Sequence, residues 1–453
     1  MASVSRALSR IKEDLGPFLS AADICDACRQ AGHVWRERIL GPVATLHLFV
    51  LQLLHRNTAI RALRHLADTM PNASAYCRAR MRLPLEALRT LLGKAADAIN
   101  KANGGASDAA GLWHGHRTLL LDGSSTIAPD TPATQKVYPQ PSNQKRGCGF
   151  PVPKLLGMID AFTGVLLEIA AFPLYTHEAA KTWKLHARMN EGDLVVADRG
   201  FCSYVNLTLL AAAGVLALFR VHQRQIVDFR VRRKHNPRGK KAKKGKPTSR
   251  WIRRLGKHDQ LVEWVKPKRR PAWMSKEQFE AIPQTLRVRE IRYTLACKGQ
   301  RTVCVTIATT LLDEKRYCKE DIAALYGLRW SIETHLAELK TTLGMRKVKC
   351  QTPEGVEKEL IIYALVYNLV RATMLVAAKQ QEVEASRISF IDAMRWLQTA
   401  RPGEPVPKLV VNPCRPDRHE PRVVKDLQDT YRKMTRPRAE LRTAMKRGEF
   451  VTR

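Results

Sequence analysis

One stretch of about helix length constrains this chain more than any other. It begins Tyr326-Gly-Leu-Arg329-Trp-Ser-Ile-Glu333 and extends to Lys340, a spacing of Tyr-x2-Arg-x3-Glu-x6-Lys. At about 100° per residue, the last three of these side chains fall about 300°, 340° and 320° round from the tyrosine. The spacing therefore predicts a helix with all four side chains on one face. A carboxylate flanked by two cations and a tyrosine can bind a metal ion beside a phosphate.

The charge of the chain points to a polyanionic partner. It has 453 residues, of which 77 are Lys or Arg and 42 are acidic, so its net charge is +35. Such an excess indicates nucleic acid first and an anionic membrane surface second. The sequence shows neither a basic amphipathic helix, nor a signal peptide, nor 18 uninterrupted apolar residues, so no membrane partner is expected.

Hydrophobic residues make up 45% of the chain, which indicates a globular protein of two to four domains. Its ten cysteines are scattered, as is typical of free thiols in a reducing cytoplasm. Cys25 and Cys28 form the only close pair. They lack a second pair at zinc spacing, so we interpret them as core or surface residues.

Residues 1–112 are predicted to form a helical domain that binds DNA ends. Apolar residues recur there at intervals of three and four, and a basic segment with Arg78 and Arg80 follows Pro71-Asn72. A helix, a short turn and a basic helix can form a DNA-reading element. A solvated basic face explains the same pattern equally well.

From residue 113 the pattern changes to short apolar runs. They predict buried strands at residues 118–122, 155–160, 165–170, 192–198 and 215–221. Helices are expected over residues 178–189 and 205–213. This order predicts an α/β fold in which helices flank a mixed sheet, with residues 113–221 as its first part. Arg220, at the last strand, is a candidate DNA contact.

The next segment, residues 222–310, is predicted to be a basic, β-rich insertion. Residues 230–257 hold 14 Lys or Arg and no acidic residue, and period-two runs follow. Residues 311–378 return to helices and include the Tyr326 stretch. Residues 379–453 form a basic C-terminal region, partly helical, for DNA binding or oligomerisation.

Three carboxylates occupy informative places. Asp122 and Asp198 each end a predicted buried strand, and Glu333 lies on the helix after the insertion. Strand-end acids point into the crevice at the sheet edge, and a helix crossing that edge can add a third. Three converging carboxylates suit Mg²⁺ or Mn²⁺. Asp160 also follows a strand, but it opens a hairpin turn and is interpreted as a turn residue.

Together these positions resemble the DDE transposases of bacterial insertion sequences, in the group with a Tyr/Arg/Glu/Lys signature (insertion-sequence family 4). Supporting stretches are Leu121-Asp-Gly-Ser124, Ala197-Asp-Arg-Gly-Phe201 and Tyr367-Asn-Leu-Val-Arg371. The resemblance covers residues 35–375. It implies an RNase H-like catalytic core, split by the β-rich insertion, in a bacterial protein that acts at the nucleoid.

The resemblance also implies roles for individual residues. Asp122, Asp198 and Glu333 would be the catalytic metal ligands, for Mg²⁺ or alternatively Mn²⁺. Tyr326 and Arg329 would contact a phosphate near the cleaved end, and Lys340 one near the transferred end. Hydrolysis would free a 3′-hydroxyl that attacks target DNA, within a homodimer or larger assembly that pairs two element ends. Relatives stack an aromatic residue of the insertion on a flipped base, but the sequence assigns that role to none of Trp251, Trp264 and Trp273.

Three other functions remain open. A domesticated DNA-binding protein that no longer cuts would have no need of all three carboxylates. A metal-dependent nuclease would need the carboxylates but no pairing of ends. A basic structural or RNA-binding protein would explain the charge but not the Tyr326–Lys340 face.

Overall fold

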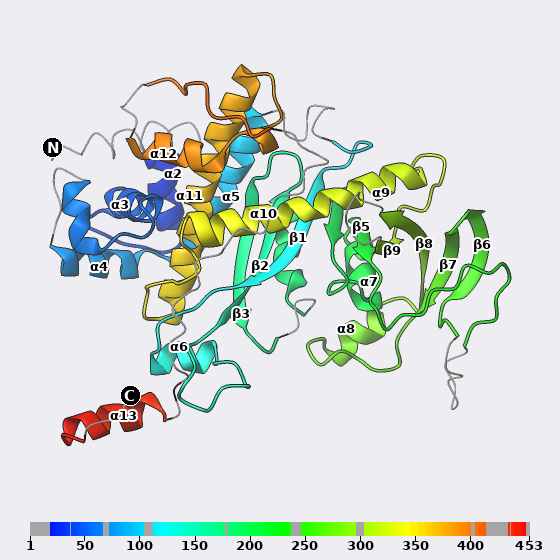
Figure 1. The fold of residues 1–453 in the computed structure, drawn as a ribbon, viewed down its shortest axis with the longest axis horizontal. Coiled ribbons are helices and arrows are strands. Elements are labelled where there is room, and N and C mark those ends of the chain that lie inside the picture. The colour runs from blue at the N-terminus through cyan, green and yellow to red at the C-terminus, as the bar shows by residue number, and fades with distance from the viewer. Residues whose placement is uncertain are drawn as a thin grey trace.

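The computed structural model describes residues 19–36, 38–66, 72–103, 112–176, 180–236, 246–295, 303–399, 404–413, 434 and 436–449. Its centre is one mixed sheet in the order β3-β2-β1-β4-β5-β9-β8-β7-β6 (Figure 1). The strands are β1 (Thr118–Ser125), β2 (Pro153–Asp160), β3 (Leu166–Pro173), β4 (Leu194–Ala197), β5 (Leu216–Arg220), β6 (Arg250–Gly256), β7 (Asp259–Val265), β8 (Thr285–Leu295) and β9 (Val303–Thr309).

The first five strands form the part of the sheet that the chain's apolar runs predict. β1, β4 and β5 are parallel, while β2 pairs antiparallel with β1 and β3 pairs antiparallel with β2. This order, 3-2-1-4-5, is the RNase H-like arrangement. Successive side chains enter opposite layers: Leu120 joins the core under the long C-terminal helices, and Leu119 and Leu121 join the core around α7. Both faces are therefore covered, as parallel strands require.

The insertion extends the same sheet. β9 pairs antiparallel with β5, and β8, β7 and β6 follow outward. The predicted α/β class, with helices flanking a mixed sheet and a β-rich insertion, is therefore confirmed. The boundaries proposed between the five segments stay predictions. β6 is the outer edge, with an exposed, arginine-bearing surface and two register shifts against β7.

Helices at the N-terminal end gather beside the sheet, opposite the insertion strands (Figure 1). They are α2 (Ala21–Gln30), α3 (Pro42–Leu54), the 3-10 turn Ile60–His65, α4 (Ala73–Arg82) and α5 (Leu85–Ala102). The others are α6 (Pro132–Val137), α7 (Tyr204–Ala212), α8 (Lys276–Ala281), α9 (Lys319–Gly327), α10 (Ser331–Ala337), α11 (Pro353–Gln380), α12 (Phe390–Thr399) and α13 (Arg438–Lys446). The helix predicted over 178–189 is, in its described part, only a 3-10 segment, Thr182–Arg188.

α11 ties the helical layer to the hairpin between β2 and β3. The Tyr367 hydroxyl donates to the Gly164 carbonyl at 2.9 Å, and Asn368 pairs with both the N–H and the C=O of Leu166. The Arg371 guanidinium donates to the Thr163 carbonyl at 2.7 Å. α11 is also long and apolar enough to cross a membrane, but 94% of its most apolar stretch is buried inside the protein. It is therefore the central helix of the core.

The contacts of α11 with the β2–β3 hairpin, which we call the α11 clamp, give a test of the fold. Gly164 has φ +71°, and a Cβ there would lie 2.5 Å from Arg371 Nη2; Gly192 has φ +85° and open space around it. We expect Gly192→Ala to lower the free energy of unfolding by about 1–2 kcal/mol through backbone strain. Gly164→Ala should lower it by a further ~1–3 kcal/mol, because Arg371 loses its carbonyl partner. Urea unfolding of both variants measures the difference, and equal losses would contradict the clamp.

Candidate active site

The predicted four-residue face lies on one continuous helical run, but the run is not a uniform α-helix. α9 passes through a 3-10 turn (Leu328–Trp330) into α10, and a π-helical turn (Glu338–Thr342) follows. Tyr326 and Arg329 are buried, Glu333 is exposed and Lys340 is half-buried. Short π-helical turns are frequent at functional sites.

Asp122 and Asp198 occupy adjacent positions at the centre of the sheet. β1 and β4 are parallel, with Leu121 beside Ala197, so the next residue on each strand is an aspartate. β4 ends at Ala197, whereas β1 continues past Asp122 to Ser125 and pairs Asp122 with Gly157 of β2. The buried half of β1 ends just before Asp122, but the strand itself continues to Ser125. Asp122 therefore lies within the strand and not at its end, where the apolar run predicts it.

α10 brings Glu333 over the same part of the sheet. It packs against β1 and, in Figure 1, crosses over the strands with α9 as one rod. A Cβ on Gly157 would lie 3.7 Å from Leu336 Cδ2, so the helix passes over the residue paired with Asp122. Glu333 precedes Leu336 by three residues and therefore shares its face of the helix.

One carboxylate oxygen of Asp198 is buried without a hydrogen-bond partner among the described residues. This atom is Oδ1, while Arg199 Nε lies 3.9 Å from Oδ2. Burial raises the pKa of Tyr326, and the Asp198 charge adds to this rise, with Arg329 and Arg220 opposing it. The tyrosine, the aspartate and both arginines are therefore near neighbours.

Glu333 is held by Arg329 and not by a closed metal site. Arg329 Nη2 donates to Glu333 Oε1 at 3.1 Å, and the guanidinium lies 4.4 Å from the Trp330 ring. Within the described ranges, no three His, Cys, Asp or Glu side chains are close enough to share a metal ion. The three carboxylates are oxygen donors of the type that Mg²⁺ prefers, and Asp198 Oδ1 lacks a partner. The donor set fits a metal, provided that Glu333 turns from Arg329.

The predicted cations differ in their surroundings. Burial, followed by the charge of Arg346, lowers the pKa of Lys340. Arg220 ends β5 and is half-buried. Arg78 is exposed on α4, whereas Arg80 is turned inward.

The contacts of Arg80 lie within the protein. Its guanidinium donates to Gln52 Oε1 at 2.8 Å and to Cys350 Sγ at 3.2 Å, and it lies 4.3 Å from the Phe49 ring. The residue packs α4 against α3, and the DNA contact predicted for it stays a prediction.

Arg78 lines a cleft of about 760 Å³ that the sequence did not reveal. Its described polar lining includes His33, Arg36, Arg38 and Arg82, and its floor is apolar. No acidic residue occurs in the described part of this lining. The sequence signal was present in the dense arginines of residues 36–38 and 78–82, but spacing along the chain did not show that they face each other.

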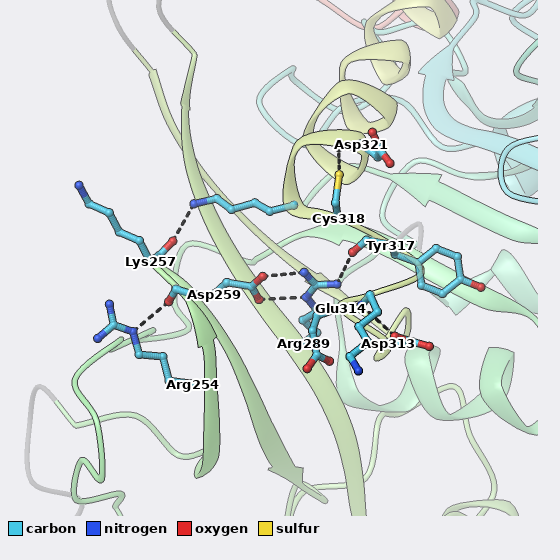
Figure 2. A network of polar contacts seen from close by, with 12 residues as sticks. Arg254, Lys257, Asp259, Arg289, Asp313, Glu314, Tyr317, Cys318 and Asp321 are labelled. Carbon is cyan, nitrogen blue, oxygen red and sulfur yellow. Dashed lines mark hydrogen bonds and ion pairs between the residues drawn. The ribbon is translucent and has the colours of Figure 1, made fainter.

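The insertion is fastened to the segment that enters α9, as Figure 2 shows. Arg289 of β8 is 1% exposed and pairs with both oxygens of Asp259 on β7, at 2.9 and 2.6 Å. Its Nη1 also donates to the Tyr317 carbonyl at 2.7 Å. We call these three residues the Arg289 brace. Cys318, the next residue, caps α9 by accepting from the Asp321 N–H.

Tyr317 connects the brace to the core strands. Its hydroxyl lies 2.8 Å from His116 Nε2, and His116 Nδ1 lies 2.8 Å from the Gly192 carbonyl. His116 precedes β1, Gly192 precedes β4 and Tyr317 precedes α9. One chain of contacts therefore links the starts of β1 and β4 to the start of the helical run that continues from α9 into α10, where Glu333 lies.

The chain is similar to known transposases. Residues 113–369 match the family model described as Transposase DDE domain. The chain is 27% identical over 374 residues to the transposase InsG of insertion sequence element IS4 from Escherichia coli (strain K12), covering 78% of this chain and 76% of that one. A piggyBac transposase, solved by cryo-EM as a synaptic complex with hairpin DNA, aligns at a TM-score of 0.41 with 10% identity, over 88% of this chain and 82% of that one. That score is too low to support an argument, but the family match spans more than half of the chain: this protein belongs to the DDE transposase family.

Proposed function

We propose that this protein is the transposase of an insertion sequence. It binds the terminal repeats of its element, cleaves them in a metal-dependent reaction, and joins the freed 3′-hydroxyl to target DNA. The observation that supports this proposal is that Asp122 and Asp198 follow paired residues of two parallel strands, with Glu333 on the helix that packs over them. Membership of the DDE transposase family supports phosphoryl transfer on DNA as the reaction.

Each step exchanges one phosphorus–oxygen bond for another. In cleavage, water attacks the phosphorus at the element end, and the 3′-hydroxyl of the element leaves. In joining, that hydroxyl attacks a target phosphodiester, and a target 3′-hydroxyl leaves. A divalent cation, Mg²⁺ or Mn²⁺, would be held by Asp122, Asp198 and Glu333 and would neutralise charge on the attacked phosphate.

The chain's own residues hold and orient the DNA. Tyr326 and Arg329 present donors that have no partner among the described residues, with Asp198 near Tyr326, and Lys340 supplies a further cation. The cleft lined by Arg36, Arg78 and Arg82 is a suitable surface for backbone phosphates of the element end. Two ends must be held together for joining, so we infer a dimer or larger assembly on DNA, acting in the cytoplasm at the nucleoid.

The first test is cleavage and joining of a labelled duplex with the element's own end, in Mg²⁺ or Mn²⁺. We expect Glu333→Ala to lower both reactions at least about 100-fold and to leave end binding intact. Glu320→Ala, at an exposed site on α9, is the matched control and should cut normally. Binding without cleavage by the wild type would favour a domesticated protein, and cleavage without joining would favour a nuclease.

A comparison of Tyr326 with Tyr367 distinguishes a functional hydroxyl from a structural one. Its buried hydroxyl has no partner in the described part of the chain, whereas the Tyr367 hydroxyl has two. We expect Tyr326→Phe to change the free energy of unfolding by less than about 0.5 kcal/mol and to slow cleavage about 10-fold. Tyr367→Phe should instead lose about 1–2 kcal/mol of stability. Equal stability losses, measured by urea unfolding, would show that Tyr326 is merely structural.

Salt dependence tests the arginine cleft. Each phosphate contact contributes about 0.9 to the slope of log affinity against log salt. We expect Arg78→Ala to weaken end binding and to reduce this slope by about one contact, whereas Lys379→Ala, exposed near the end of α11, should leave both unchanged. An unchanged slope in Arg78→Ala would remove the cleft from the DNA path.

A further inference from the structure

Unpaired hydrogen-bond donors gather where the insertion meets the Tyr326 helix. In the parts of the chain that the structure describes, the buried hydroxyls of Tyr293 and Tyr326 and the Nε of Arg329 have no hydrogen-bond partner. An unpaired buried polar group destabilises a folded protein, so each one calls for an explanation. Three donors at one place indicate a ligand that accepts hydrogen bonds.

Strand register places Tyr293 on the helix side of the sheet. On β8, Ile291 and Tyr293 share a face; Ile291 belongs to the core cluster that contains Tyr326, and Tyr293 packs against it. On β5, Phe219 belongs to the opposite core, so Arg220 points to the same side as Tyr293. β9 joins these strands, pairing with Arg220 at Ile307 and with Tyr293 at Val305.

The charges around the two tyrosines agree with this placement. Burial raises the pKa of Tyr293 to about 12, and the charges of Arg220 and Arg329 oppose the rise. Tyr326 responds to the same two arginines and to Tyr293. Both phenols are therefore protonated at neutral pH and available as donors.

The Arg289 brace holds Tyr293 in this position. Arg289 precedes Tyr293 by four residues on β8 and points to the same side of the sheet. Through the Tyr317 carbonyl it fixes β8 to the segment that enters α9. Tyr293 therefore lies on a strand that Arg289 fixes to the segment before α9, and Tyr326 lies at the other end of α9. A donor that the fold holds in this way needs little reorganisation when a ligand arrives.

The hydrogen-bond donors and charges of this cluster indicate which ligand it binds. Two phenol hydroxyls and two guanidinium groups match the non-bridging oxygens of a phosphodiester. The Asp198 charge lies near Tyr326 and Glu333 pairs with Arg329, so the two guanidinium groups of Arg220 and Arg329 offset these two carboxylates. A base edge would not need two guanidinium charges.

We propose that Tyr293, from the insertion, is a phosphate-binding residue of the active site. Its hydroxyl, the Tyr326 hydroxyl and the Arg329 Nε–H donate to one phosphodiester group of the bound DNA end. The proposal rests on the proposed function and gives the insertion a direct part in holding the substrate. It also makes the docking of the insertion a condition for a complete site.

The test is end binding without metal, so that cleavage plays no part. Duplex ends carry a neutral methylphosphonate at one phosphate at a time, and binding is measured for wild type and Tyr293→Phe. We expect Tyr293→Phe to weaken binding of the unmodified end about 10-fold. One methylphosphonate should weaken wild type by a similar factor and weaken Tyr293→Phe no further. Unchanged binding by Tyr293→Phe, or additive losses at every position, would overturn the proposal.

Tyr138→Phe is the matched control, because it removes a buried hydroxyl that donates to Glu357 at 3.3 Å, outside the site. It should bind every duplex as wild type does. A second arm needs no DNA: inorganic phosphate should raise the unfolding temperature of wild type and of Tyr138→Phe, and raise that of Tyr293→Phe less. Equal protection of all three proteins would count against the proposal even if the ends are cleaved normally. Loss of the phosphate effect in Tyr293→Phe would support it even if cleavage fails.

Discussion

The Arg289 brace is the interaction on which the arrangement of this molecule depends. A guanidinium that is 1% exposed is tolerated only when its hydrogen bonds are satisfied. Arg289 meets this condition with Asp259 on one side and the Tyr317 carbonyl on the other. Because Asp259 belongs to the insertion and Tyr317 to the segment before α9, separating the two segments would leave Arg289 without one of its buried hydrogen bonds.

The brace also explains why the insertion continues the catalytic sheet. Pairing of β9 with β5 fixes its edge, and the brace fixes its outer strands against the helix above. Tyr317 then passes the constraint to His116 and Gly192, at the starts of β1 and β4. The starts of β1, of β4 and of the helical run from α9 to α10 therefore share one set of contacts. The site residues Asp122, Asp198, Tyr326 and Glu333 lie farther along the chain from these starts.

Much of this fold could be predicted from the sequence, because buried parallel strands appear as unbroken apolar runs. Asp160 was likewise identifiable as a turn residue, and its Oδ1 accepts from the N–H groups of Phe162 and Thr163. The helix expected over residues 178–189 is, in its described part, a shorter 3-10 segment. Apolar spacing alone does not distinguish a 3-10 segment from an α-helix.

In the site, the sequence predicted which residues share a helix face but not what each side chain contacts. Arg80 meets Cys350, which is 270 residues away along the chain, and no local pattern reveals such a partner. Tyr293 was missed for the same reason: only the pairing of β8 with β9 and of β9 with β5 brings it beside Tyr326. The ion pair of Glu333 with Arg329 depends on side-chain rotamers, which spacing along the chain does not determine.

The outer edge of the sheet has a consequence for the free protein. An open edge strand offers unpaired backbone groups to any other strand, which is a route to aggregation. β6 carries arginines along this edge, and its pairing with β7 is broken by two irregularities. Two copies meeting edge to edge would bring the arginines of both β6 strands together across an irregular strand, which disfavours further pairing at this edge.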